Sequence, residues 1–199
     1  MITLLLLACS TEPVVSPAPA PVPAPVEAPP PGAAPAATGT PWVIDPSMST
    51  VTASAHKLIG GHDLNFPSTT GALRMQDGVL VGLEVTVAIA TLTTDAEKLT
   101  GHLLTPDFFD AATMPSATFT STGVTGTAPD YTVTGDLSIH GKSKSVTFPA
   151  TANLVEGVLI ASAEVPLDRN DFSLIYPGKS DNLIQNAVEL KVKLVAKAP

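Results

Sequence analysis

The chain has 199 residues, a formal net charge of −8, and 44% hydrophobic residues. With only 10 Lys and Arg in the whole chain, the clustered basic residues that bind nucleic-acid phosphates are missing, which argues against nucleic acid as a partner. The single cysteine excludes an intramolecular disulfide.

Residues 1–9 are typical of the end of a secretory signal. The leucines at 4–7 form an apolar run far shorter than the roughly 20 residues that span a bilayer. The segment LLAC at 6–9 resembles the bacterial lipobox. The resemblance implies cleavage before Cys9 and several acyl chains that anchor the protein through it, and Ser10 after it implies release to the outer membrane. No Lys or Arg precedes the leucines, so we expect the true start to lie upstream of residue 1. A stray or buried cysteine is the alternative.

Residues 10–40 form a segment rich in Pro and Ala. Ten of the 20 prolines lie between Pro13 and Pro35. Proline fixes φ and removes backbone donors, so the segment predicts neither helix nor sheet but an extended spacer. A ligand for a proline-binding module is the alternative; basic or aromatic specificity residues are missing, which favours the spacer.

From Val51 onward, apolar and polar residues alternate with a period of two, which predicts half-buried strands. Turn residues at 76–78, 128–130, 141–142 and 156–157 separate these strands. The residues expected to share inward faces are Val79, Val81, Leu83, Val85, Val87 and Ile89; Tyr131, Val133, Leu137 and Ile139; Val146, Phe148, Ala150, Ala152 and Leu154; and Val188, Leu190, Val192 and Leu194.

One helix is predicted after residue 94. Thr94 and Glu97 have the spacing of a capping box, in which Thr94 accepts a hydrogen bond from the amide of Glu97. Leu99 and Leu103 then lie at i and i+4 on one face of the helix.

A second turn is expected at Thr105-Pro106, directing Phe108 and Phe109 toward the core. Many short strands with a single helix predict an all-β domain over residues 41–199. The expected architecture is an antiparallel, lipocalin-like β-barrel of about eight strands with one short helical insertion. A β-sandwich is the competing architecture.

Several motifs carry a family resemblance. From Trp42 to the end, the chain resembles the YceI-like family, known for periplasmic polyisoprenoid-binding proteins. The matching segments, in chain order, are WVIDP at 42–46, HKLIGGHD at 56–63, LTGHLLTPDFFD at 99–110, MP at 114–115, ATFTST at 117–122, VTGDL at 133–137, GKSK at 141–144 and RNDF at 169–172.

The resemblance implies an apolar lipid in a barrel interior, and we expect an isoprenoid, quinone or fatty acyl ligand with no other cofactor. Val51, Ala53 and Ala55 offer small inward side chains where many relatives have Phe and Val, which would widen the cavity or leave the wall to be filled from elsewhere. The expected ligand-lining residues are Val51, Ala53, Ala55, Leu64, Phe66, Val85, Val87, Ile89, His102, Phe108, Phe109, Phe119, Leu137 and Ile139. Taken singly, each is better explained as plain core than as ligand wall; as a set, some of them must line any cavity that exists.

The polar candidates have structural explanations. No pair among His56, His62, His102 and His140 has a zinc-ligand spacing, so we predict no metal site; His140 is expected on the outward face of its strand, and His102 to face the Phe108–Phe109 region. Turn bonding and ion pairing account for Asp45, Asp110, Asp136 and Arg169. No nucleophile elbow, Ser-His-Asp order, paired carboxylates or phosphate loop is visible, so we predict no enzyme.

The leading hypothesis is an exported outer-membrane lipoprotein, facing the periplasm or the cell surface, that sequesters or carries an apolar lipid. The second is an interaction domain whose barrel interior is filled, and the third, an enzyme, has no residue set behind it. A homodimer stays open.

Overall fold

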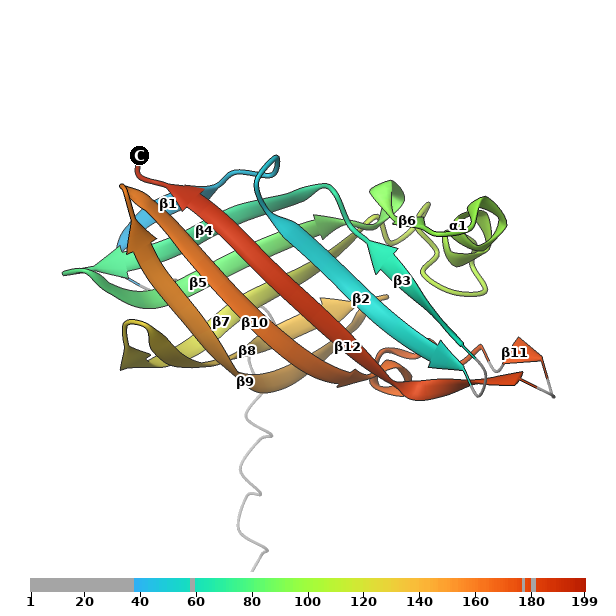
Figure 1. Ribbon diagram of the computed structural model, residues 1–199. Helices are drawn as coiled ribbons and strands as arrows, with labels where there is room; N and C mark the ends of the chain where they lie inside the picture. The colour runs from blue at the N-terminus through green and yellow to red at the C-terminus, as the bar shows by residue number, and fades with distance from the viewer. Residues whose placement is uncertain (1–37, 58–59, 177, 180–181) are drawn as a thin grey trace, which may run out of the picture. The chain divides into compact units, whose positions relative to one another are not determined.

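The computed structural model describes residues 38–57, 60–176, 178–179 and 182–199 (Figure 1). Cys9 and most of the Pro/Ala-rich segment lie outside these residues. The strands are β1 (Thr40–Ile44), β2 (Thr50–Lys57), β3 (Gly61–Asn65), β4 (Thr69–Gln76), β5 (Val79–Ala88), β6 (Thr93–Thr94), β7 (Ser116–Thr127), β8 (Asp130–Ile139), β9 (Lys142–Val155), β10 (Val158–Asp168), β11 (Gly178–Lys179) and β12 (Asn182–Lys197). The helices are α1 (Glu97–Leu103) and the short 3-10 turns η1 (Ile89–Thr91) and η2 (Arg169–Phe172).

Eight of these strands form a closed antiparallel ring. Their order is β1-β4-β5-β7-β8-β9-β10-β12, and β12 pairs back onto β1 at Val43↔Lys197 and Ile44↔Ala196. β2 pairs with the same strand, β12, further from its end, and β3 and β6 continue from β2. The prediction of a barrel with one short helix is confirmed, and the sandwich is excluded.

Polar contacts join the segment between β1 and β2, residues 45–49, to β12. The amide of Asp45 donates to the Val195 carbonyl at 2.8 Å, and the Val195 amide donates to the Ser49 hydroxyl at 3.0 Å. The Asp45 carboxylate accepts hydrogen bonds from the Ser47 amide and hydroxyl at 3.0 and 2.6 Å, and from Lys197 Nζ at 2.6 Å. These contacts to Lys197, followed by those to Ser47, lower the pKa of Asp45 from 3.8 to about 2.

This low pKa predicts a pH-dependent contribution to stability. Because the folded-state pKa lies below the unfolded one, ionised Asp45 stabilises the fold above pH 3.8, and the effect is lost as the pH falls to about 2. We expect the unfolding free energies of the wild type and Asp45→Asn to differ most above pH 3.8 and to converge toward pH 2 in urea titrations. A difference that stays constant across this range would contradict the assignment.

A bulge in β5 corrects the predicted faces of that strand. The register of β5 against β4 slips between Arg74 and Met75, which leaves Val81 without an opposite residue. Because side chains alternate across a sheet, the slip reverses the faces, so that Leu80 is 3% exposed and Val79 is 36% exposed. The prediction that Val79 and Val81 face inward is therefore wrong, whereas Leu83 and Val85 are buried as expected.

The end of β9 also departs from the prediction. Leu154 is 58% exposed although its alternation placed it in the core. The pairing of β9 with β8 ends at Thr151, so beyond this point the strand has only β10 as a neighbour. The β9–β10 hairpin thus continues past the packed interior and carries Leu154 with it.

The predicted capping box does not form. The residue before α1 is Ala96, which makes no side-chain cap, and Thr94 belongs to β6, where it pairs with Leu64 of β3. The Thr94 hydroxyl lies 3.0 Å from the Thr100 hydroxyl and accepts a hydrogen bond from the Ala96 amide at 3.2 Å. Strand pairing has taken Thr94 out of the position that a cap requires.

The rest of the α1 region follows the sequence pattern. Leu103 is 5% exposed, and Leu99 packs against the core beside it. The turn after α1 brings the Phe109 amide to the Leu103 carbonyl at 3.1 Å and buries the Phe109 ring. His140 differs from its prediction, because it lies in the β8–β9 turn with φ of 49°, and its Nδ1 is 3.3 Å from the Phe172 carbonyl. None of the helices in the described part of the chain is long and apolar enough to span a membrane.

Candidate functional site

The barrel encloses a cavity of about 230 Å³. Its wall is built from the inward faces of the strands, together with α1, the turn after it and η2. The side chains on the wall are apolar, with five exceptions: Lys57, His62, Thr118, Ser162 and Arg169. The two-residue alternation of the strands places them there, because every second side chain points inward.

All the predicted ligand-lining residues except His102 lie on the cavity wall. They are Val51, Ala53, Ala55, Leu64, Phe66, Val85, Val87, Ile89, Phe108, Phe109, Phe119, Leu137 and Ile139. The structure brings them together from β2, β3 and the residue after it, β5, η1, β7, β8 and the turn after α1. Whether a ligand contacts them stays a prediction.

The hollow is due to small side chains on β2, β9 and β10, where β12 lies between β2 and β10. Ala53 and Ala55 project from β2, Ala161 and Ala163 from β10, and Ala150 from β9 opposite Ala163. A methyl group fills far less of a barrel interior than the branched or aromatic side chains that pack small barrels solid. The alanines therefore explain why this barrel has an internal space.

Aromatic rings also line the interior. The Phe119 and Phe148 rings have centroids 5.5 Å apart, and Phe66 meets Phe109 edge to face at 6.5 Å. Gly135 makes room for the Phe119 ring, since a Cβ at that position would lie 2.4 Å from its Cζ. All four rings form part of the cavity wall.

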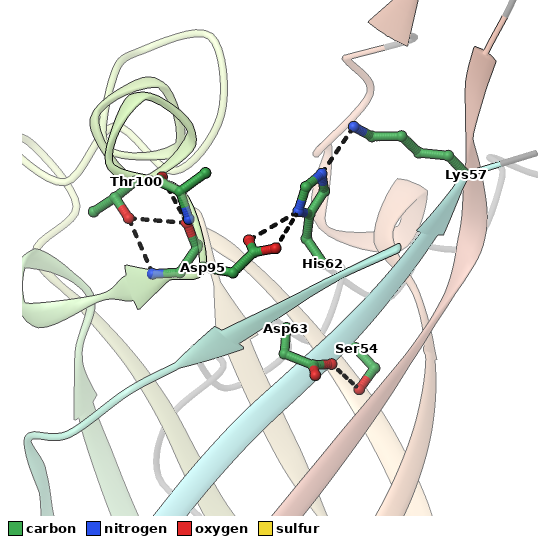
Figure 2. Close-up of polar contacts among 8 residues, drawn as sticks. Ser54, Lys57, His62, Asp63, Asp95 and Thr100 are labelled. Carbon is green, nitrogen blue, oxygen red and sulfur yellow. Dashed lines mark hydrogen bonds and ion pairs between the residues drawn. The ribbon is translucent and has the colours of Figure 1, made fainter. Parts of the chain in front are cut away.

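Polar side chains gather at the end of the barrel near α1, which we call the α1 end. Lys57 Nζ lies 3.1 Å from His62 Nε2, and His62 Nδ1 lies 2.9 Å from one Asp95 carboxylate oxygen (Figure 2). These partners assign a neutral imidazole that donates from Nδ1 to Asp95 and accepts at Nε2 from the Lys57 ammonium. The hairpin between β2 and β3 brings Lys57 and His62 together. The pairing of β6 with β3 brings Asp95, the residue after β6, to His62.

Arg169 is a buried cation at the same end. Its side chain, 8% exposed, lines the cavity and donates Nε–H to the Gln185 carbonyl at 3.1 Å. Its two terminal nitrogens bond to the carbonyls of Leu174, Tyr176 and Ile184 and to the Asn186 side-chain oxygen. Arg169 thereby joins the segment after η2 to the start of β12. The sequence predicted turn bonding and ion pairing for Arg169. The turn bonding is present, whereas the five oxygens that accept its hydrogen bonds are all uncharged.

His102 lies beside the cavity wall and does not form part of it. Its ring meets Phe108 edge to face with centroids 5.5 Å apart and meets Tyr176 at 4.9 Å. Its Nε2 is 3.6 Å from an Asp107 carboxylate oxygen. His102 therefore connects α1 to the segment after η2, and it faces the Phe108 region as expected without lining the cavity.

The prediction missed part of the wall. Phe172 and Leu174 line the cavity from η2 and the segment after it, where the sequence has no alternation to reveal an inward face. Lys57 and His62 also line it; their proximity depends on the β2–β3 pairing and has no local signal. Among the described residues, no three His, Cys, Asp or Glu side chains converge in a way that could hold a metal ion.

The fold and the cavity together define a class: a closed antiparallel β-barrel with an apolar interior, the architecture in which eight-stranded barrels hold one small ligand. Within this class, the chain belongs to the YceI-like domain family, whose family model matches residues 42–196.

Individual relatives match over shorter segments. A UPF0312 protein of Pseudomonas fluorescens is 33% identical over 117 residues, which cover 55% of this chain and 60% of that protein. Protein YceI of Escherichia coli is 38% identical over 68 residues, which cover 34% of this chain and 36% of that protein. The matches thus span less than two thirds of the length of either relative.

Two solved structures share the fold. Burkholderia cenocepacia BcnA superposes with a TM-score of 0.72 at 24% identity, over 77% of this chain and 99% of BcnA. A polyisoprenoid binding domain from Saccharophagus degradans, implicated in plant cell wall breakdown, superposes with a TM-score of 0.67 at 16% identity, over 80% of this chain and 99% of that domain. At these identities the likeness concerns the fold alone.

Proposed function

We propose that the barrel binds an apolar, isoprenoid-like lipid in its interior. The observation that carries this proposal is the cavity, whose wall is apolar on nearly every strand of the ring. Burial of an apolar chain there contributes about 25 cal/mol per Å² of apolar area, less the cost of ordering the chain. The fold shared with a polyisoprenoid binding domain supports the same class of ligand.

The size of the cavity favours a thin ligand. Its volume of about 230 Å³ lies just below the 300–1,000 Å³ that ligand pockets typically have. A narrow apolar space suits an extended hydrocarbon chain better than a bulky fused-ring molecule. The same small volume supports the second candidate, an interaction domain whose interior holds no ligand.

Native mass spectrometry of the domain purified from its own cells separates the two candidates. We expect an isoprenoid, quinone or fatty acyl lipid to be released from the protein on denaturation. An empty protein that also takes up no such lipid from vesicles would overturn the proposal and favour the interaction domain.

We further propose that Cys9 carries acyl chains and anchors the domain to the outer membrane, facing the periplasm. The lipobox-like segment at residues 6–9 supports this. We expect Cys9→Ser to abolish metabolic labelling by an alkyne fatty acid and to move the protein out of the membrane fraction, whereas Ser10→Ala retains the label. Equal labelling of Cys9→Ser and wild type would refute the anchor.

A further inference from the structure

Lys57 and His62 lie where the apolar interior meets a polar cleft on the outside. Both side chains line the cavity, and both also line a separate cleft whose other walls include Gly61, Asp95 and Gln185. A lipid with its chain in the cavity has its polar group at such a junction, because the chain gains from burial while the polar group needs partners or water. The side chains at this junction therefore select the head group.

The cleft at this junction holds one ammonium, that of Lys57, and two carboxylates, those of Asp63 and Asp95. Among the described residues, the Lys57 ammonium contacts His62 Nε2 at 3.1 Å, and no carboxylate lies within ion-pair distance of it. Asp95 binds the opposite nitrogen of His62, so the imidazole stands between the carboxylate and the ammonium (Figure 2). A lysine has three N–H donors, and the contact with His62 uses one.

A second cation, Arg169, lies at the α1 end. Arg169 lines the cavity, and its Nη2 donates to the carbonyl of Ile184, the residue that pairs with Lys57 across β12 and β2. The hydrogen bonds of Arg169 all go to uncharged oxygens, so its charge has no counter-ion among the described residues. Its five donors are occupied, which leaves Arg169 to contribute charge and Lys57 to contribute direct contact.

We infer that Lys57 binds the anionic head group, a carboxylate or phosphate, of an amphiphile whose apolar chain fills the cavity. The inference rests on the proposed function, since it takes the cavity as the site of the chain. Asp95 and His62 are positioning residues that hold the ammonium at the junction. An ammonium is a point charge with rotatable donors, so it suits either anion.

The test compares two ligands that share one chain. Binding of farnesol and of farnesoic acid, which is ionised at pH 7, is measured by displacement of a fluorescent fatty-acid probe from wild type, Lys57→Met, Lys57→Arg and Lys193→Met. Lys193 lies exposed on β12, so Lys193→Met removes the same charge away from the cavity. Acetate serves as the head group without a chain.

We expect wild type to bind farnesoic acid about tenfold more tightly than farnesol, which equals about 1.4 kcal/mol, with the ratio decreasing at high salt. The ratio falls to about one in Lys57→Met and stays at the wild-type value in Lys57→Arg and Lys193→Met, and acetate alone displaces no probe. Equal binding of acid and alcohol by wild type, or an unchanged ratio in Lys57→Met, overturns the head-group inference. If wild type binds neither farnesol nor farnesoic acid, the proposed function is overturned instead.

Discussion

Replacing Arg169 with methionine is expected to lower the free energy of unfolding by about 3 kcal/mol or more. Arg169 is 8% exposed, and its guanidinium donates to four backbone carbonyls and to the Asn186 side chain. Methionine supplies no donor, and each buried carbonyl left without one costs about 1–3 kcal/mol before relaxation. Urea unfolding followed by circular dichroism measures the change.

Two further variants test whether the loss of stability comes from the hydrogen bonds of the Arg169 guanidinium. Arg169→Lys keeps the charge but lacks the planar set of five donors, so we expect it to lose most of the same stability. Lys144→Met breaks an ion pair with Asp171 whose side chains are 49% and 51% exposed, and should change stability by no more than about 0.5 kcal/mol. An Arg169→Met protein as stable as Lys144→Met would show that the carbonyls find other donors.

Replacing Ala53 with phenylalanine is expected to eliminate lipid binding. Ala53 is 7% exposed and points from β2 into a cavity of about 230 Å³, so an aromatic ring at this position occupies the space that we propose for the lipid chain. We expect at least a tenfold decrease in the amount of lipid that copurifies, measured as moles of lipid per mole of protein by mass spectrometry.

The fold of this variant should persist, because the ring fills existing space and buries additional apolar area. Thr52→Phe is the matched control: Thr52 is the neighbouring residue on β2, pairs with Lys191 on β12, and is not part of the cavity wall. It should retain the lipid. Equal lipid content in Ala53→Phe and Thr52→Phe would place the lipid outside the barrel interior.

The sequence predicted the fold where local pattern and strand pairing agree. In β8, Tyr131, Val133 and Leu137 alternate without interruption, and all three are buried. In β5 the alternation was equally regular, but the bulge that reverses its faces depends on the pairing with β4, which no local pattern contains. Thr94 shows the same limit, because its strand pairing with β3 competes with the cap that its spacing predicts.

The apolar wall was therefore more predictable than the polar end of the site. Phe119 and Leu137 could be assigned to the interior from their own strands. Lys57 and Asp95 meet through His62, and Asp95 is 33 residues beyond His62 in sequence, so only the folded β2–β3–β6 arrangement brings the three together. Arg169 was recognised as structural, but its partners are backbone carbonyls, which have no sequence signature.

The pairing of β1 with β12 has a kinetic consequence. Asp45 and Lys197, joined at this seam, are 152 residues apart, so ring closure has to pay the entropy of a loop that includes almost the whole domain. The seam cannot form until the last strand is available, whereas hairpins such as β7–β8 and β9–β10 can form locally. Hydrogen exchange during refolding should therefore show the amides of β1 becoming protected after those of the hairpins.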